Sequence, residues 1–430
     1  MYCLIDGSRF YCSSSTAMRP DLRDKCVLVA SGLDGISIAA SRACSEHNIP
    51  KFTPIFQVKD KLALFGGVVI KANFGMLGLL SQRMMQSIDH AMGVGLPHYV
   101  YSVDEVFYDL KDLHSVGVDL EAHLLAVRKR VYQETRIGTG GGIGRTLTLA
   151  KCGSFAGKKL PGYNGQCVLD TIRHENAVLK SMPTKEIWNI GAKLTEHLKH
   201  KGITNAYQLK LADPRAMQRE FSINVANVVH ELNGTPVLNF SDTAPPKQQI
   251  FSTSSSRHRL TDPDTVSKIL ADHAAQVCKK ARAQNSDIVR LQVFVATSPY
   301  DRCPRHHAAV TIELDTPTSD TSIVLKHVRN ALPRVLPLCL LTQPLYKTGV
   351  GAQQLVNAEM RQFDLFQTSQ DNTPLMQALD GLNERFGKGT LGFASQSSLP
   401  SSQVATGHVE LIELPNYLTN YQQLIKIKCQ

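Results

Sequence analysis

Short apolar stretches of strand length recur near the start of this chain, each bounded by polar or turn-forming residues. Residues 1–6, 25–30 and 67–70 predict strands, because their apolar side chains run together and then meet an acid, a Ser-Gly pair or a lysine. From 76 to 92 the apolar residues recur at helical spacing, which predicts a long amphipathic helix. The Ala- and Ser-rich segment 36–47 also predicts a helix. Strands interleaved with helices indicate an α+β unit.

The pattern continues with an acidic strand, a helix and a run of glycines. The strand contains Asp104 and Glu105, and the helix is expected over roughly 113–134. The glycine run, 137–144, predicts a strand or turn edge that leads into a helix at Thr146. Its glycines match neither the GxGxxG spacing nor a P-loop, so we interpret it as a tight turn rather than a phosphate-binding loop.

Beyond residue 170 the pattern changes twice. Residues 184–234 read as helical, and 187–203 has the outline of a helix, a tight glycine turn and a second helix. A Pro-bearing polar stretch at 236–249 predicts an interdomain linker. Residues 250–355 then predict alternating strands with helices near 263–282 and 319–331. The remaining residues are polar, with a serine-rich part expected to be flexible.

Composition and charge narrow the class of protein. A chain of 430 residues is too long for one core, and its 43% hydrophobic content supports globular folding. The net charge of +10 favours a polyanionic partner. Ten scattered cysteines without a CxxC pair indicate reduced thiols in a cytoplasmic protein. We see no signal-peptide pattern and no apolar run of about 18 residues, so no membrane span is expected.

Three carboxylates stand where the strand pattern would bury them. Asp6 ends the first strand, and Asp104 and Glu105 lie in the later one. A buried carboxylate is costly unless a cation or hydrogen bond compensates it, and three together repel one another unless a divalent metal holds them. Oxygen-only ligation suits Mg²⁺, and two such ions about 4 Å apart serve phosphoryl transfer. From the residues alone, ordinary strand-end carboxylates are the alternative interpretation.

The strings around these acids resemble the two acidic motifs of Y-family translesion DNA polymerases. The matching strings are Asp6-x-x-x-Phe10-Tyr11 and Tyr101-Ser-Val-Asp104-Glu105. Within that family the resemblance is strongest to the UmuC-type catalytic subunits of bacterial DNA polymerase V, and it extends over residues 1–395. The order and spacing of the two motifs make this assignment more specific than either motif alone.

The resemblance implies a multidomain α+β fold shaped like a right hand, with a small fingers domain, a helix-hairpin-helix thumb and a little finger. The expected bounds are palm, 1–25 and 78–170; fingers, 26–77; thumb, 171–235; linker, 236–249; little finger, 250–355; and a C-terminal clamp- and partner-binding tail, 356–430. A small fingers domain and an open active site would accommodate damaged template bases.

The resemblance also assigns the metal ligands. Asp6 and Asp104 would bridge two Mg²⁺ ions, and the carbonyl of Gly7 would be a further ligand. Glu105 would complete the site of the ion that activates the primer 3′-hydroxyl. These three carboxylates are therefore the expected catalytic residues.

The nucleotide site is expected beside the metals. In the family, the residue that matches Tyr11 lies under the sugar of the incoming dNTP and excludes a 2′-hydroxyl, while Phe10 partly packs in the core. Lys158 would contact the triphosphate, although a lysine at this place can also cap a helix C-terminus. We interpret Lys151 as a structural or DNA-backbone contact.

The chain departs from the family at three positions near the nucleotide. Ser45 stands where the family usually has a basic residue that grips the triphosphate, and Arg42, one helical turn away, is a candidate substitute. Leu77 replaces a common tyrosine and Leu147 a common lysine. The departures predict weakened or altered nucleotide binding.

DNA contacts are expected in two places. The thumb turn at Gly191 and Lys193 would offer backbone N–H groups and charge to a DNA phosphate without reading sequence. The helix that carries Lys279, Lys280 and Arg282 places positive charge beside the little-finger sheet. Contacts of this kind make binding fall with salt and show little sequence preference.

A short motif after the last domain predicts a protein partner. Gln362, Leu365 and Phe366 resemble the sliding-clamp-binding peptide of bacterial polymerases, in which Leu and Phe fill a hydrophobic pocket. Residues 385–394 resemble a C-terminal region associated with a UmuD-type dimer and RecA. No membrane partner is expected.

These inferences combine into one expected function and two alternatives. The chain is expected to be a DNA-directed DNA polymerase (a nucleotidyltransferase) for error-prone translesion synthesis in the SOS response, acting on primer-template DNA and dNTP. The first alternative is a catalytically weak or inactive protein of the same fold that binds clamp and RecA and regulates other polymerases. The second, a metal-dependent nuclease, gives no use to Tyr11 or the thumb motif.

Overall fold

The computed structural model describes residues 1–31, 35–238, 246–360, 371–387, 389–396 and 411–414. The chain divides into two compact units, one of 1–244 with 406–430 and one of 245–405. The division falls inside the segment 236–249. Each unit has its own sheets and its own hydrophobic core.

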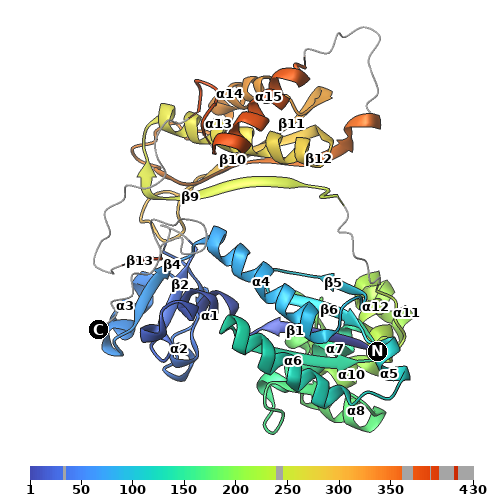
Figure 1. Cartoon of the computed structure of the whole chain (residues 1–430). Helices are drawn as coiled ribbons and strands as arrows, with labels where there is room; N and C mark the ends of the chain where they lie inside the picture. Colours follow the sequence, from blue (N-terminus) through green and yellow to red (C-terminus); the bar gives the residue numbers. More distant parts are fainter. Residues whose placement is uncertain (32–34, 239–245, 361–370, 388, 397–410, 415–430) are drawn as a thin grey trace. The chain divides into compact units, whose positions relative to one another are not determined.

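A five-stranded sheet of order β5-β6-β1-β7-β8 carries the first unit (Figure 1). Its strands are β1 (Tyr2–Gly7), β5 (His98–Val100), β6 (Glu105–Asp109), β7 (Thr139–Gly144) and β8 (Gln166–Val168). The central strand β1 pairs antiparallel with β6 on one side and with β7 on the other. The two acidic motifs, about a hundred residues apart in sequence, therefore lie on neighbouring strands.

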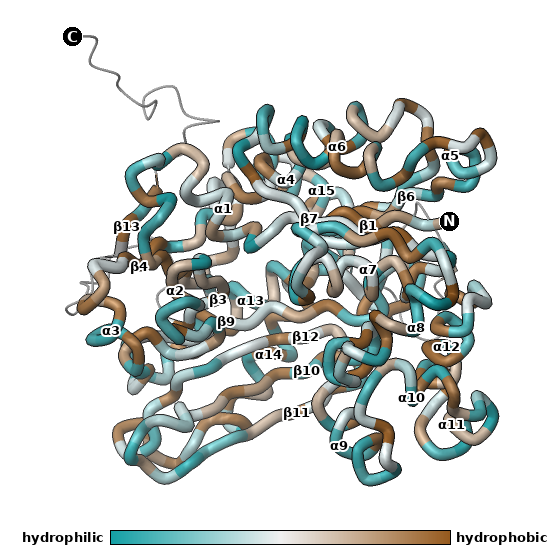
Figure 2. Tube along the Cα trace, turned by 90° about the horizontal axis from the view of Figure 1, so that it is seen from below, coloured by the Kyte–Doolittle hydropathy of each residue, from teal (hydrophilic) through white to brown (hydrophobic). Residues whose placement is uncertain are grey.

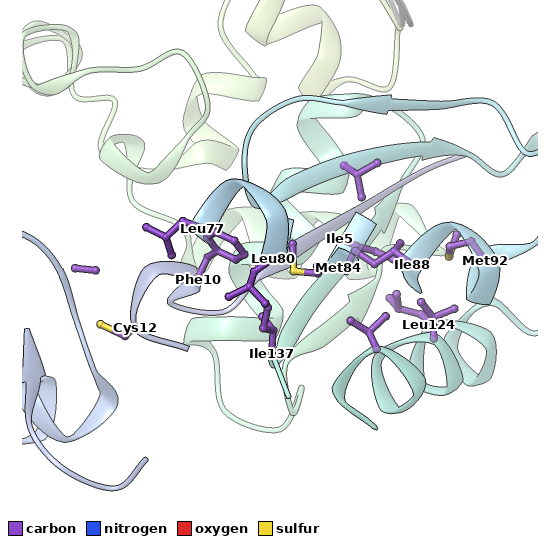
Figure 3. Close-up of a cluster of buried hydrophobic side chains, with 14 of the residues drawn as sticks. Ile5, Phe10, Cys12, Leu77, Leu80, Met84, Ile88, Met92, Leu124 and Ile137 are labelled. Atoms are coloured by element: carbon purple, nitrogen blue, oxygen red, sulfur yellow. The ribbon is translucent and has the colours of Figure 1, made fainter. Parts of the chain in front are cut away.

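The two faces of this sheet are covered by different helices. Cys3 and Ile5 of β1 belong to a core formed with α4 (Phe74–Met92) and α6 (Leu120–Thr135). Figure 3 shows Ile5 beside Met84 and Ile88 of α4, with Leu124 of α6 nearby. Leu4 instead packs with Leu147 and Ala150 of α7 (Leu147–Lys159), because side chains alternate between faces along a strand.

The glycine run forms the strand β7 in the interior of the sheet and leads into α7, so the predicted strand is confirmed and the interpretation as a tight turn was wrong. Its glycines let α7 lie directly on the strand. A Cβ at Gly142 would stand 2.0 Å from the backbone nitrogen of Ser154, and one at Gly144 would stand 2.7 Å from Leu149. The missing side chains thus bring α7 to contact distance of the sheet.

The smaller sheet of this unit has the order β13-β4-β2-β3. Its elements are β2 (Val27–Ala30), β3 (Ser37–Ala40), β4 (Val68–Lys71) and β13 (Leu411–Glu413), with α1 (Phe10–Ala17), η1 (Pro20–Leu22), α2 (Arg42–Glu46) and α3 (Ile55–Leu64) around them. The helix expected over 36–47 was wrong in its first half, because Ser37–Ala40 pairs with β2. Pairing with a buried strand outweighs the weak helical preference of Ala and Ser.

Two other helix predictions needed correction. The helix expected over 113–134 is split into α5 (Lys111–Ser115) and α6, and Gly117 lies between them with a φ of 74°. A left-handed φ ends a helix, and glycine adopts it without strain. The segment 187–190 was expected to be helical but is irregular.

Six short helical elements follow the palm sheet. They are α8 (Ile172–Ser181), η2 (Thr184–Glu186), α9 (Ala192–His200), α10 (Ala206–Lys210), α11 (Pro214–Glu220) and α12 (Ile223–Leu232). Within 187–203 only α9 is helical, and it is followed by a turn at Gly202 with a φ of 78° and then by α10, so the hairpin was predicted too early in the chain. Arg145 and Glu175 join this region to the palm through two hydrogen bonds of 2.8 Å.

The second unit is a four-stranded antiparallel sheet of order β11-β10-β12-β9 with a β-α-β-β-α-β chain order. Its elements are β9 (Ile250–Leu260), α13 (Pro263–Ala283), β10 (Ser286–Ala296), β11 (His307–Thr318), α14 (Thr321–Val335), β12 (Leu345–Asn357), η3 (Ala358–Met360) and α15 (Thr373–Phe386). The helices α13 and α14 share one core with the sheet. Brown segments along β10 in Figure 2 mark its apolar residues.

The helices were also compared with the requirements for crossing a membrane. Among the described residues, no helix combines the length and apolar character that crossing a bilayer requires.

Candidate active site

The carboxylates of the two acidic motifs meet across one strand pair. Asp6 of β1 is the register partner of Glu105 of β6. Because side chains alternate along a strand, Asp6 shares its face with Leu4, and Glu105 shares its face with Phe107. Leu4 and Phe107 pack with the start of α7. The two carboxylates are therefore on the α7 side of the sheet.

The helix α7 supplies a lysine to each of these carboxylates. The distance from Lys158 Nζ to Asp6 Oδ1 is 2.6 Å, and that from Lys151 Nζ to Glu105 Oε1 is 2.9 Å. The two lysines are seven residues apart, which is about two helical turns and places them on the same helix face. Close packing of α7 on the glycine strand holds both ammonium groups at the carboxylates.

Asp6 is poised between opposing electrostatic effects. Its side chain is 15% exposed, and burial is the largest influence that raises its pKa above the ordinary value. Lys158 opposes this by charge and by hydrogen bonding, while Glu105 and Asp104 raise the pKa further. A carboxyl in this setting favours a nearby positive charge.

Asp104 is fixed by backbone and hydroxyl contacts. Ser102 Oγ donates to Asp104 Oδ1 at 2.7 Å, and the Gly7 N–H donates to the Asp104 carbonyl at 2.7 Å. A Cβ at Gly7 would lie 3.4 Å from the Asp104 Cβ and 3.2 Å from Phe10. Glycine at position 7 thus lets β1 and the turn before β6 approach each other.

The donor set at this place fits a hard divalent cation. The carboxylates of Asp6, Asp104 and Glu105 are oxygen ligands of the kind that Mg²⁺ prefers, and the Gly7 carbonyl stays a predicted ligand. In the described residues no three His, Cys, Asp or Glu side chains already form a ligand cluster. Here Asp6 and Glu105 are neutralised by lysines instead.

The residues expected near the nucleotide differ in their surroundings. Phe10 is a core side chain, 2% exposed. Tyr11 is half-buried, and its ring makes edge contacts with Phe10 and with Phe74, with ring centroids 5.9 and 6.4 Å apart. Arg42 is 86% exposed in its side chain and pairs with Glu46.

Two of the three departures from the family pattern are core residues in this chain. Leu77 is 1% exposed and packs within the core between the sheet and α4. Leu147 is 4% exposed and packs against Leu4 and Phe107. Ser45 alone of the three is exposed.

The sequence interpretation did not single out Arg9, and it named no partner for Lys151. Arg9, in a left-handed conformation with a φ of 51°, donates from Nη1 to the Ala40 carbonyl at 2.8 Å and links β1 to the fingers sheet. No pattern in the sequence predicts the contact between Arg9 and Ala40. Lys151 as the partner of Glu105 was also missed, although its seven-residue spacing from Lys158 was a usable signal.

The residues proposed for DNA lie in two regions. Gly191 precedes α9, and Lys193 is exposed in its first turn. In the second unit, Arg282 is only 13% exposed and makes paired hydrogen bonds of 2.7 and 2.9 Å to Asp380 of α15.

The neighbouring lysines of α13 differ from Arg282. Lys279 lies 3.8 Å from Glu384, and Lys280 is exposed. Arg282 is therefore an anchor for α15, and its DNA contact stays a prediction. The clamp motif Gln362, Leu365 and Phe366 lies outside the described residues.

Two stretches of the chain match the models of a known protein family. Residues 5–154 match the model of the impB/mucB/samB family, and residues 247–365 match that of its C-terminal domain. Residues 373–406 match a domain of unknown function. The second match begins next to the boundary between the two compact units.

Curated relatives align along the whole chain. Protein UmuC of Salmonella typhimurium is 30% identical over 100% of both chains, and Protein ImpB of Salmonella typhimurium is 31% identical over 94% of this chain and 95% of its own. DNA polymerase IV 2 of Bacillus subtilis is 23% identical over 89% of this chain and 91% of its own.

Solved structures show the same fold. A Y-family DNA polymerase chimera of Dbh and Dpo4 aligns with a TM-score of 0.61 at 16% identity, over 82% of this chain and 98% of that one. An insertion ternary complex of Dbh DNA polymerase aligns with a TM-score of 0.51 at 14% identity, over 83% and 99%. The chain therefore belongs to the impB/mucB/samB family of UmuC-like, Y-family proteins and has the right-hand fold expected from its sequence.

Proposed function

We propose that this chain is a DNA-directed DNA polymerase that adds nucleotides opposite damaged template bases by two-metal chemistry, in the SOS response to DNA damage. The observation that carries the proposal is the register pairing of Asp6 with Glu105 on β1 and β6, with Asp104 tied to Gly7 beside them. Family membership supports the same activity, because relatives carry the name DNA polymerase.

Each residue of the site has a proposed task. Asp6, Asp104 and Glu105 would hold two Mg²⁺ ions, with the Gly7 carbonyl as a further ligand and Glu105 serving the ion on the primer side. When bound, such ions lower the pKa of the primer hydroxyl and neutralise charge on the phosphates. Asp6 is suited to this task, since burial raises its pKa and a nearby cation therefore stabilises its anion.

Lys158 is proposed to serve the triphosphate once a metal takes over Asp6. Its Nζ already lies 2.6 Å from that carboxylate and is 33% exposed, so a short side-chain movement suffices to reach a neighbouring anion. A lysine acts here as a point charge on phosphate oxygens. Arg42, exposed on the fingers, is proposed as a second phosphate contact.

Tyr11 is proposed to exclude ribonucleotides. Its half-buried ring is held by edge contacts with Phe10 and Phe74. A ring fixed in this way cannot move aside for a 2′-hydroxyl, so the sugar is selected sterically.

The burial of Leu77 and Leu147 weighs against the non-catalytic alternative. Both are core side chains and stabilise the fold, so their apolar character does not by itself remove a nucleotide contact. Only Ser45 is left as an exposed departure. The three carboxylates Asp6, Asp104 and Glu105 are all present, which favours catalysis.

Partners are proposed from the family and from charge. Primer-template DNA and dNTP are the expected substrates, in keeping with the ternary complexes of Dbh and the net charge of +10. Gly191, Lys193, Lys279, Lys280 and Arg282 are the proposed DNA contacts, and Gln362, Leu365 and Phe366 the proposed sliding-clamp contacts. A UmuD-type dimer, RecA and a cytoplasmic location complete the proposal.

Primer extension past an abasic site tests this function. The reaction contains Mg²⁺, clamp and accessory subunits, and compares the natural chain with Asp104→Asn. We expect extension by the natural chain and its loss by a factor of at least about 10³ in the variant. A natural chain that binds DNA and clamp without extending the primer would contradict the proposal and favour a regulatory protein.

A further inference from the structure

Lys151 is enclosed by aromatic rings as well as paired with Glu105. Its Nζ lies 4.5 Å from the ring centroid of Tyr101, 4.9 Å from that of Trp188 and 5.7 Å from that of Phe107. Its side chain is 15% exposed. An ammonium in contact with several ring faces is stabilised by their negative quadrupoles, and more strongly where water is excluded.

The cage is itself held together by ring contacts. Trp188 makes an edge contact with Tyr101 at a centroid distance of 5.4 Å, and its Nε1–H donates to the Tyr101 hydroxyl at 3.2 Å. Trp188 also packs against Phe107, with centroids 6.0 Å apart. The three rings come from the turn before β6, from β6, and from the segment after η2.

This arrangement joins the thumb to a catalytic carboxylate. Trp188 belongs to the thumb segment, whereas Lys151 and Glu105 belong to the palm. Glu105 is 19% exposed in its side chain, and Lys151 is the cation within 4 Å of it among the described residues. The position of its carboxylate therefore depends on an ammonium that the thumb helps to hold.

We propose that Lys151 is a positioning residue that occupies Glu105 in the metal-free protein, yields it to a divalent cation, and transmits that exchange to Trp188 of the thumb. The proposal rests on the proposed function, because it requires that the carboxylates bind metal. A divalent cation at Glu105 takes up the charge of the carboxylate and repels the ammonium of Lys151, so the two cations compete for Glu105. Lys151 gives up that contact and stays in the cage, where the rings still stabilise its charge.

A competing role and a purely structural role predict opposite changes in metal affinity. If Lys151 competes with the metal, its removal eliminates a rival cation and a like charge, so metal should bind more tightly. If Lys151 only shapes the site, its removal should loosen Glu105 and weaken metal binding. The sign of the change therefore decides between them.

The single tryptophan of this chain makes the exchange measurable. All indole emission comes from Trp188, which touches the ammonium under test. We expect Mg²⁺ to change this emission in a saturable way as Lys151 releases Glu105. Mn²⁺ affinity is measured separately from the signal of free Mn²⁺ in electron paramagnetic resonance.

The experiment compares four variants of the full chain. Lys151→Met should bind Mn²⁺ at least about threefold more tightly, because a charge a few ångströms away is removed, and should lose the Mg²⁺ response of Trp188. Lys151→Arg should restore both properties toward those of the natural chain, since guanidinium also stacks on rings. Asp104→Asn should lose Mn²⁺ binding.

Lys159→Met is the matched control. Lys159 also lies on α7, pairs with Glu186 at 2.8 Å and lies 5.6 Å from the Phe155 ring, but it contacts none of the three carboxylates. It should keep the metal affinity and the Trp188 response of the natural chain.

Polymerase kinetics give a second readout. Lys151→Met should lower kcat at saturating Mg²⁺ with the nucleotide KM nearly unchanged, because Lys151 acts through Glu105 and not on the nucleotide.

The outcomes separate this inference from the function on which it rests. A natural chain that binds no Mn²⁺ would overturn both. Mn²⁺ binding with an unchanged Trp188 signal, or weaker Mn²⁺ binding by a folded Lys151→Met, would overturn the inference alone and leave the polymerase proposal in place.

Discussion

Lys158 and Asp6 form an ion pair of 2.6 Å between the last turns of α7 and the end of β1. The contact exists because four of the six residues of β7 are glycines, and a Cβ at Gly140 would stand 3.1 Å from the Lys158 side chain. With Lys151 on Glu105, it leaves two of the three acidic side chains of the site paired with lysines. The contacts of this structure can be tested by thermal stability, by nucleotide selection and by amide hydrogen exchange.

Asp6→Asn is expected to raise the thermal stability of the metal-free protein. Burial raises the Asp6 pKa, so the folded state holds the proton more tightly than the unfolded state. The free energy of unfolding therefore falls as the pH rises from the pKa of Asp6 in the unfolded chain through its raised pKa in the folded protein. This loss is complete at neutral pH. The side chain of asparagine does not ionise, so the variant does not lose this stability as the pH rises.

The measurement is Tm in the presence of a chelator at pH 7.5 and at pH 4. We expect a Tm rise of about 1–3 °C at the higher pH and a smaller one at the lower pH, with polymerase activity abolished. Asp21→Asn is the control, because the Asp21 pKa is lowered by Arg19 and its variant should not gain stability at neutral pH. An equal gain at both pH values would contradict the explanation.

Lys158→Met is expected to weaken nucleotide use while metal binding persists. The ammonium proposed for the triphosphate is lost, so the dNTP KM should rise by about tenfold, as for loss of one charged contact. Single-nucleotide insertion kinetics measure this, with Lys159→Met beside it. Equal dNTP KM values in Lys158→Met and Lys159→Met would show that Lys158 does not contact the nucleotide.

Tyr11→Ala is expected to relax sugar selection. Loss of the ring opens the space that a 2′-hydroxyl would need, so the ratio of dNTP to rNTP insertion should fall by about 10²-fold or more. Phe74→Ala should give a smaller fall, because Phe74 supports Tyr11 only by an edge contact. Unchanged selection in Tyr11→Ala would show that another group excludes ribonucleotides.

Asp380→Asn is expected to loosen α15 from the second unit. The Arg282–Asp380 pair is 13% and 21% exposed, so removing one partner leaves a poorly solvated charge and should cost about 1–3 kcal/mol. Hydrogen exchange in α15 and limited proteolysis report the release. Glu384→Gln is the control, because its partner Lys279 lies 3.8 Å away and Glu384 is 71% exposed.

Deleting residues 406–430 is expected to expose the edge of the fingers sheet. Leu411–Glu413 pairs in parallel with Val69–Lys71, and Leu414 is 7% exposed within the palm and fingers core. Amide exchange in β4 should accelerate on the order of tenfold. Glu413→Gln removes only its ion pair with Lys71 and should change little, since Glu413 is 70% exposed. Unchanged protection after the deletion would show that β13 contributes nothing to this sheet.

The sequence by itself determined the elements whose pattern is strong and local. The apolar strand β1 and the helix α4 follow from uninterrupted or periodic apolar residues, since each period reports which face is buried. The acidic motifs determined the family and the right-hand fold. The seven-residue spacing of Lys151 and Lys158 was a signal in the sequence that went unused, and it names no partner for either lysine.

The tertiary structure decided everything that depends on which element lies beside which. It made Ser37–Ala40 a strand, because that segment pairs with the buried strand β2, and it placed the glycine strand β7 inside the sheet, where α7 packs directly on the glycines. It assigned Lys151 to Glu105 and Arg282 to Asp380. These contacts join residues 46 and 98 positions apart, and local periodicity carries no information about pairing at such separation.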